Sequence, residues 1–203
     1  MYNIFPLFES IRLENGCFHL LSLHEKRMRK AHLKLFKSAL PFNLSDHLMA
    51  FNPPGTGLYK CRLVYGKQLS VPEFLPYHRK SIRSLRLIES GAIVYPHKFA
   101  NRSNINQLLN KRNDCDDVLI VKNGIVTDTS YCNIVFGTGS DWLTPEKPLL
   151  EGVQRDYLLN EGIIKKASIS IKDIKKFKYF RLINAMIPWE DSSVQNIDNI
   201  FGF

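Results

Sequence analysis

Residues 122–136, KNGIVTDTSYCNIVF, carry more information on the fold than any other stretch of the chain. Asn123-Gly124 lies between two apolar runs, and this pair accepts the positive φ angles that a tight β-hairpin needs. We therefore predict strands over Val118–Val121 and Ile125–Thr127, on either side of the turn. The next strand is expected over Asn133–Gly137.

The N-terminal part of the chain contains a second hairpin signal. Leu7–Leu13 alternates enough to be a strand, Glu14-Asn15-Gly16 supplies the turn, and Cys17–Leu21 is expected to be the returning strand. Ser22 is predicted to cap a helix that runs to about Ala39, because a glutamate follows three residues later as in a capping box.

The remaining elements are interspersed without a strict βαβ rhythm, which indicates an α+β fold with mixed or antiparallel sheets. Further strands are predicted over Leu58–Tyr65, Leu85–Ser90, Ala92–Tyr95, Trp142–Leu143, Ala167–Ile171 and Tyr179–Asn184. Helices are predicted over Ser45–Phe51, Asn101–Lys111 and Gly152–Asn160. The Pro-containing stretch Val71–Tyr77 is expected to be irregular, and Val71–Ser84 is the best candidate for a linker.

The bulk composition excludes several classes of protein. The chain has 203 residues and a net charge of +9, and its four cysteines are scattered and form no CxxC pair. A zinc cluster and a disulfide framework are therefore not expected, and reduced thiols in the cytoplasm are the plain interpretation. No apolar run is long enough to cross a bilayer, so no membrane span is expected. The basic residues are spread along the chain, which favours a solvated surface over a nucleic-acid site.

Four segments, taken in order, are more specific than any single residue. The first comprises Leu7–Arg12, Glu14–Gly16 and Leu23–Met28, and the second is His97–Arg102. The third comprises Asn123–Asp128 and Cys132–Phe136, and the fourth comprises Leu143–Pro145, Leu150–Arg155 and Ile183–Met186. This ordered set resembles the class IV aminotransferases, the fold-type IV group of pyridoxal 5′-phosphate (PLP) enzymes, over nearly the whole chain.

The resemblance implies a two-domain architecture like that of D-amino-acid aminotransferase. A small N-terminal α/β sandwich is expected over residues 1–79. A larger C-terminal PLP-binding domain, built on a curved, mixed, barrel-like sheet, is expected over residues 80–203. The family works as homodimers, so a homodimer is expected here, with no metal.

The resemblance also assigns roles to individual residues. Lys98 matches the lysine that forms the Schiff base with PLP, and a neutral lysine also serves as a general base once it is released. Asp128 stands where the family has a glutamate beside the pyridine nitrogen, and it is one methylene shorter. The resemblance implies that the PLP phosphate is bound by the side chain of Arg27 and by the backbone amides of Val153, Gln154 and Ala185.

The substrate is harder to derive from the sequence. Arg62 and Tyr65, on a strand that faces the site in relatives, and Tyr95, just before the lysine segment, are candidates to hold a carboxylate. The ending Asn184-Ala185-Met186 resembles that of 4-amino-4-deoxychorismate lyases, which form 4-aminobenzoate and pyruvate for the folate pathway. An amino-acid transaminase, for branched-chain or D-amino acids, is the alternative. A non-catalytic basic binding protein on the same fold is the third hypothesis.

Overall fold

A computed structural model describes residues 6–203, and the chain divides into two compact units. Unit 1 comprises the chain up to Arg79 together with His97–Asn101. Unit 2 comprises Lys80–Pro96 and Arg102–Phe203. The short segment around residue 98 therefore folds with the N-terminal unit, although the chain on both sides of it belongs to unit 2.

Unit 1 is built on an antiparallel sheet with the order β2-β1-β3-β4. The strands are β1 (Leu7–Glu14), β2 (Cys17–Phe18), β3 (Leu58–Tyr65) and β4 (Glu73–Pro76). Side chains of β1 alternate between buried and half-buried, as expected for a sheet with one face on the core. Pairing between β1 and β3 is continuous from Leu7↔Tyr65 to Glu14↔Leu58, so the predicted strands are confirmed here.

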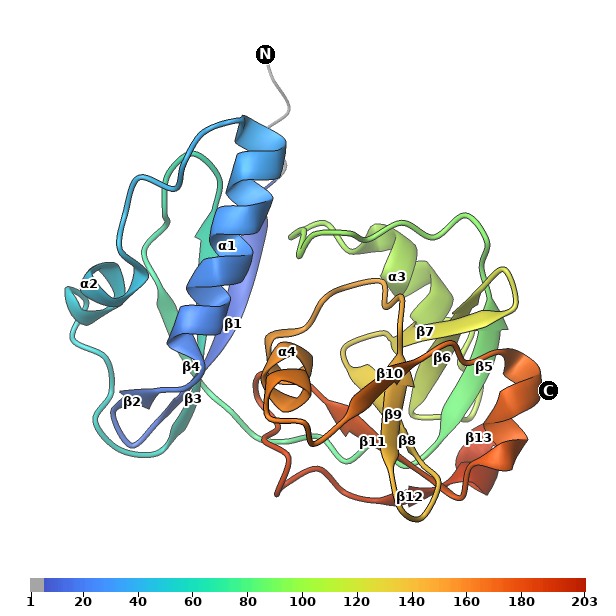
Figure 1. Ribbon diagram of the computed structural model, residues 1–203. Helices are drawn as coiled ribbons and strands as arrows, with labels where there is room; N and C mark the ends of the chain where they lie inside the picture. The colour runs from blue at the N-terminus through green and yellow to red at the C-terminus, as the bar shows by residue number, and fades with distance from the viewer. Residues whose placement is uncertain (1–5) are drawn as a thin grey trace. The chain divides into compact units, whose positions relative to one another are not determined.

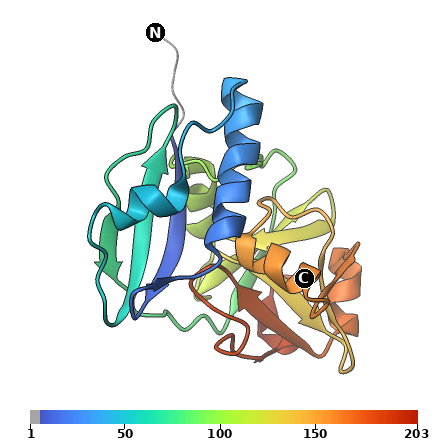
Figure 2. The ribbon, with the colours of Figure 1, turned by 60° about the vertical axis from the view of Figure 1, so that its left-hand side comes forward.

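One face of this sheet is covered by helix α1 (Leu21–Phe36), as Figures 1 and 2 show. Leu7, Ile11 and Leu63 of the sheet pack with Met28 of the helix in a continuous apolar core. The shorter helix α2 (Leu44–Met49) adds two more buried leucines to the same core.

Three predictions in unit 1 are wrong. The returning strand ends at Phe18 rather than at Leu21, because α1 begins at Leu21. Ser22 does not cap α1, because Leu20 occupies the N-cap position in a left-handed conformation with φ 54° and no side chain caps the helix. The capping-box pattern is present in the sequence, but it lies inside the first turn. Val71–Tyr77 is not irregular, because β4 pairs with the edge of β3. Proline is tolerated at the end of an edge strand, where its missing N–H costs no ladder hydrogen bond.

Unit 2 contains a nine-stranded mixed sheet with the main order β10-β9-β8-β7-β6-β5-β13, and with β11 and β12 attached through β8. The strands are β5 (Leu85–Glu89), β6 (Asp117–Lys122), β7 (Ile125–Thr129), β8 (Asn133–Gly137), β9 (Trp142–Pro145), β10 (Lys165–Ala167), β11 (Tyr179–Ile183), β12 (Gln195–Asn196) and β13 (Ile200–Phe201). The helices are α3 (Ser103–Leu109), α4 (Val153–Asn160) and two 3₁₀ turns, Ile171–Lys176 and Ile197–Asn199. This mixed α+β architecture agrees with the fold class expected from the sequence.

Strand β8 lies at the centre of unit 2. All five of its residues are buried, and it pairs with β7, β9 and β11. The hairpin that precedes it is confirmed, because Asn123 and Gly124 have φ angles of 51° and 75° between β6 and β7. The Asn123-Gly124 turn starts the β6–β7 pairing at Lys122↔Ile125. The next turn, closed by a hydrogen bond from the Thr129 N–H to the Cys132 carbonyl, brings Asp128 opposite Asn133.

Two strand predictions in unit 2 are wrong. Ala92–Tyr95 forms no strand. Ala167 is the last residue of β10 rather than the first residue of a strand, and a 3₁₀ turn begins at Ile171. Ser170 caps that turn with a capping box formed with Asp173, which ends extended structure before residue 171.

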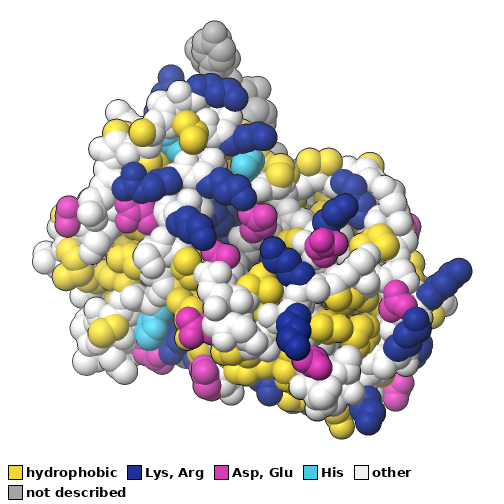
Figure 3. All heavy atoms as spheres, in the orientation of Figure 1, with side chains coloured by type: hydrophobic (Ala, Val, Ile, Leu, Met, Phe, Trp, Pro, Cys, Tyr) yellow, Lys and Arg dark blue, Asp and Glu magenta, His cyan; other side chains and the backbone are white. Residues whose placement is uncertain are grey.

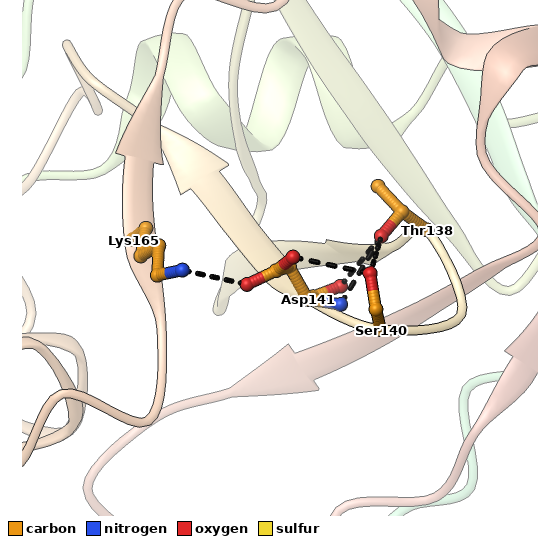
Figure 4. A network of polar contacts seen from close by, with 4 residues as sticks. All are labelled: Thr138, Ser140, Asp141 and Lys165. Atoms are coloured by element: carbon orange, nitrogen blue, oxygen red, sulfur yellow. Dashed lines mark hydrogen bonds and ion pairs between the residues drawn. The ribbon is translucent and has the colours of Figure 1, made fainter.

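The loop between β8 and β9 is closed by a polar network at the surface, shown in Figure 4. Asp141 Oδ1 accepts from Lys165 Nζ of β10 at 2.7 Å, and its backbone N–H donates to Thr138 Oγ1 at 3.1 Å. Ser140 Oγ donates to the other carboxylate oxygen at 3.1 Å. The network joins the loop to the parallel edge strand and lies in solvent.

Within residues 6–203, no disulfide joins the four cysteines. No helix in the same range is long and apolar enough to span a membrane.

Candidate active site

Asp128 lies near the end of β7, in the interior of unit 2. Its side chain is buried, and each carboxylate oxygen accepts a hydrogen bond. Asn133 Nδ2 donates to Oδ1 at 2.7 Å, and the backbone N–H of Leu150 donates to Oδ2 at 2.9 Å. The acid is therefore held in one orientation by groups on β8 and on the loop before α4.

Burial raises the pKa of Asp128 to about 6, while the bonds from Leu150 and Asn133 and the charge of Arg155 oppose the rise. Desolvation disfavours the charged form of an acid, and hydrogen bonds to that form favour it. At neutral pH the carboxylate predominates. An ionised carboxylate in such an environment can hold a proton on a basic ring nitrogen.

Asn133 connects Asp128 to the segment that leads into α4. Its Nδ2 also donates to the carbonyl of Leu150 at 2.9 Å. Its Oδ1 faces Gly152, where an added Cβ atom would lie only 2.0 Å from that oxygen. Gly152 is therefore required for close packing rather than for an unusual backbone, because its φ of −74° is open to any residue.

The N-terminus of α4 presents backbone amides without a side-chain cap. Gly152 is the N-cap residue and has no side chain to bond the first turn, and Val153 and Gln154 behind it are buried. Such a helix start is suited to an anion, because its N–H groups and its dipole both favour negative charge. Ala185 follows β11 in a turn in which Asn184 Oδ1 accepts from the N–H of Met186 at 2.8 Å.

Arg155 is a buried cation that sequence reasoning missed. It is only 4% exposed, and its Nη2 donates to the carbonyl of Pro145 at 2.7 Å. Its charge acts on Asp128 through the interior of unit 2. No local pattern predicts this placement, because it depends on how α4 packs against β9.

In unit 1, Arg27 belongs to a buried polar cluster. Glu9 of β1 is fully buried and receives His24 Nδ1 at 2.7 Å and Arg27 Nε at 3.0 Å. Arg27 Nη2 donates to the same carboxylate, which completes a bidentate ion pair. The His-x-x-Arg spacing places both donors on one face of α1, since residues three apart are neighbours on a helix.

Lys98 is attached to the edge of the unit 1 sheet. Its carbonyl accepts from the N–H of Phe8 at 2.9 Å, and its Nζ lies 4.7 Å from the centre of the Phe8 ring. The guanidinium of Arg62 lies 5.7 Å from the same ring, and Arg62 Nη1 donates to Glu73 at 2.8 Å. Lys98 and Arg62 are therefore close to one aromatic side chain.

The other two substrate candidates are buried side chains. Tyr65 is 2% exposed and belongs to the core cluster under α1, and burial raises the pKa of its hydroxyl. Residues three apart on a strand point to opposite faces, so Tyr65 and Arg62 do not share a face. Tyr95 belongs to unit 2, where it is buried in the connection between β5 and α3.

The structure thus collects the sequence-predicted residues into two groups. In unit 1, Arg27 lies in the Glu9–His24 cluster, and Lys98 lies near Arg62. In unit 2, Asp128 is bonded to the loop that precedes the α4 amides.

Comparison with known proteins identifies the family. A model of the amino-transferase class IV family matches residues 63–190. An uncharacterized protein of Haemophilus influenzae (strain ATCC 51907 / DSM 11121 / KW20 / Rd) is 37% identical over 185 residues, which is 90% of this chain and 98% of the relative.

Three solved structures are similar over most of the chain. The crystal structure of a candidate 4-amino-4-deoxychorismate lyase from Haemophilus somnus 129PT matches 92% of this chain and 98% of its own, with 37% identity and a TM-score of 0.84. A candidate amino-acid aminotransferase from Mesorhizobium loti matches 97% and 99%, with 21% identity and a TM-score of 0.81. An aminotransferase from Brucella abortus bound to PLP matches 97% and 81%, with 16% identity and a TM-score of 0.71.

The fold is therefore that of the fold-type IV aminotransferases. With a family match over more than half of its length and a relative 37% identical across nearly all of it, this chain belongs to the amino-transferase class IV family.

Proposed function

We propose that this protein is a PLP-dependent lyase that converts 4-amino-4-deoxychorismate to 4-aminobenzoate and pyruvate. The observation that carries the proposal is the 37% identity to the candidate lyase from Haemophilus somnus over 92% of the chain. The ending Asn184-Ala185-Met186, which forms a turn after β11, supports the same choice.

The chemistry of the donors fits PLP. The cofactor requires an amine for its aldehyde, an acid for its pyridine nitrogen and anion donors for its phosphate. Unit 2 offers a buried carboxylate that is charged at neutral pH, together with a helix start whose N-cap is a glycine. Unit 1 offers the amine of Lys98 and the guanidinium of Arg27.

Each residue then has a separate task in the proposal. Lys98 holds the cofactor through its amine and, once released, moves a proton at the substrate. Asp128 keeps the pyridine nitrogen protonated. The phosphate is bound by Arg27 and by the amides of Val153, Gln154 and Ala185. When bound, PLP supplies the electron sink for the substrate carbanion.

The substrate carboxylate is assigned to Arg62. Its guanidinium lies beside the same Phe8 ring as the Lys98 amine, so a substrate whose amine displaced Lys98 from the cofactor would have a cation for its carboxylate nearby. The ion pair of Arg62 with Glu73 is partly exposed, so exchange for a substrate carboxylate would cost little.

The test is to supply the purified PLP-loaded protein with 4-amino-4-deoxychorismate and no keto acid. We expect 4-aminobenzoate and pyruvate in equal amounts. Product that forms only when an α-keto acid is added would refute the lyase assignment. Sodium borohydride reduction followed by peptide mass mapping should place the cofactor on Lys98.

An amino-acid transaminase is the second candidate. The structure from Mesorhizobium loti, a candidate amino-acid aminotransferase, matches this chain over nearly the full length of both chains. In that case an amino acid alone should convert the bound cofactor to its amine form. A non-catalytic basic binding protein would take up no cofactor. On the face that Figure 3 shows, Lys and Arg side chains are scattered among Asp and Glu, which gives nucleic acid no continuous stripe.

The same proposal places the enzyme in the cytoplasm as a homodimer, in the folate pathway. Sedimentation of the loaded protein would test the oligomeric state.

A further inference from the structure

Glu9 is a buried carboxylate to which neither the sequence motifs nor the proposed mechanism assigns a task. It lies in the middle of β1 and is fully buried. Three donor atoms hold it: Nδ1 of His24, and Nε and Nη2 of Arg27. A buried charge is tolerated only when it is paired and hydrogen-bonded, so this cluster is built as one unit.

The ionisation of the cluster is fixed. The ion pair with Arg27 and the bond from His24 outweigh burial and lower the pKa of Glu9 to about 2. Burial lowers the pKa of His24, and the charges of Arg27 and Lys98 add to that effect. His24 is therefore neutral, with its proton on Nδ1 toward Glu9. Its Nε2 is buried and makes no hydrogen bond within the described residues.

We propose that Glu9 is a positioning residue that orients Arg27 toward the phosphate of the cofactor. Its carboxylate holds the Nε–Nη2 edge of the guanidinium, so the opposite edge has one fixed direction. His24 in turn fixes the carboxylate. The inference rests on the proposed function, because it names the phosphate as the anion that Arg27 meets.

A neighbouring ion pair shows what this arrangement adds. Arg29, on the same helix, pairs with Glu25 one turn away, and its side chain is 51% exposed. Both of its contacting nitrogens share one carboxylate oxygen, so its direction is only loosely set. Arg27 instead donates to both oxygens of the Glu9 carboxylate, which is fully buried and is also bonded by His24. A flexible arginine loses much side-chain entropy when it binds, and Glu9 removes that loss in advance.

The role is indirect, so it predicts a selective effect. Glu9 acts on the phosphate only through Arg27. Replacing Glu9 should therefore weaken binding of phosphate-bearing ligands and leave phosphate-free ligands unaffected. A purely structural role would change both ligands alike, or would change only the stability.

The experiment compares dissociation constants of the apo protein for PLP and for pyridoxal, which lacks the phosphate, by absorbance titration. For Glu9→Gln we expect PLP to bind about tenfold more weakly, the size of one charge-assisted hydrogen bond, with pyridoxal unchanged. Glu25→Gln is the matched control, because it removes the same group from the other arginine of the helix. It should leave both constants unchanged.

Two further variants keep the test decisive if Glu9→Gln folds poorly. In Glu9→Gln/Arg27→Ala no unpaired buried cation remains, and its PLP affinity should equal that of Arg27→Ala. A double variant that binds PLP more weakly than Arg27→Ala would overturn the inference. In the apo protein, the Arg27 Nε–H signal in ¹⁵N NMR should broaden or shift in Glu9→Asp and stay unchanged in Glu25→Gln.

The outcomes separate the two proposals. If the unsubstituted protein binds neither PLP nor pyridoxal, the proposed function fails and the inference falls with it. If the unsubstituted protein binds PLP but Glu9→Gln weakens both ligands equally, or neither, only the role of Glu9 is refuted.

Discussion

Replacement of Gly152 by alanine tests how closely the loop before α4 packs on Asn133. The backbone at residue 152 has φ −74° and ψ 143°, which alanine adopts without strain. The added Cβ would lie 2.0 Å from Asn133 Oδ1, far inside any real contact, so one of the two must move. The effect on stability is therefore steric.

The magnitude follows from what Asn133 would lose. Its Nδ2 bonds Asp128 at 2.7 Å and the carbonyl of Leu150 at 2.9 Å. Loss of both bonds costs about 2 kcal/mol, at roughly 1 kcal/mol each. Overpacking adds about 1–3 kcal/mol. We expect Gly152→Ala to lower the free energy of unfolding, measured in urea, by about 3–5 kcal/mol.

A double-variant cycle separates the clash from other causes. Asn133→Ala alone should cost about 2 kcal/mol through its lost hydrogen bonds. In that background the amide is gone, so the added cost of Gly152→Ala should fall below about 1 kcal/mol. Gly55→Ala is a control, because an added Cβ at Gly55 meets nothing within 4 Å. Equal cost of Gly152→Ala in both backgrounds would refute the steric explanation.

Three further predictions concern charge. The folded pKa of Asp128, about 6, lies above its ordinary value of 3.8, so its contribution to stability is present below pH 3.8 and is lost as the pH rises through about 6. Between pH 4 and 7 the unfolding free energy of the unsubstituted protein, minus that of Asp128→Asn, should fall by up to about 3 kcal/mol. If this difference between the two proteins does not change with pH, Asp128 is not buried as the structure places it. Lys98→Ala should abolish turnover and borohydride fixation of PLP while leaving the urea midpoint nearly unchanged; retained turnover would remove Lys98 from the chemistry. Asp141→Ala should not measurably shift the urea midpoint, because its ion pair with Lys165, drawn in Figure 4, joins two exposed side chains; a clear shift would show that the loop network stabilises the fold.

Local sequence signals predicted the parts of the fold that depend on neighbours in the chain. The Asn123-Gly124 turn and the strands around it are where the pattern places them, because positive φ and β-branched runs are local properties. The start of α1 was mispredicted, because the left-handed Leu20 satisfies the entry to the helix and Ser22 is displaced into it. Strand β4 was missed, because its pairing with β3 is a tertiary contact.

The candidate site follows the same division. Asp128 and Asn133 are five residues apart in one motif, so sequence alone could mark both. The partner that both side chains bond, Leu150, lies 17 and 22 residues further along the chain, so a local pattern does not show the contact. The burial of Arg155 likewise depends on how α4 packs. The Glu9–Arg27 ion pair joins a strand to a helix, and only the structure shows that it is bidentate.

The contacts among Asp128, Asn133 and Gly152 have a practical consequence for protein engineering. A larger acid at 128, such as glutamate, would need space that the Asn133 side chain occupies, and Asn133 cannot move toward Gly152 because it already lies against that residue. Libraries that randomise one of these positions at a time would mostly yield damaged folds. Varying all three together gives the best chance of recovering a folded variant with a different acid at 128.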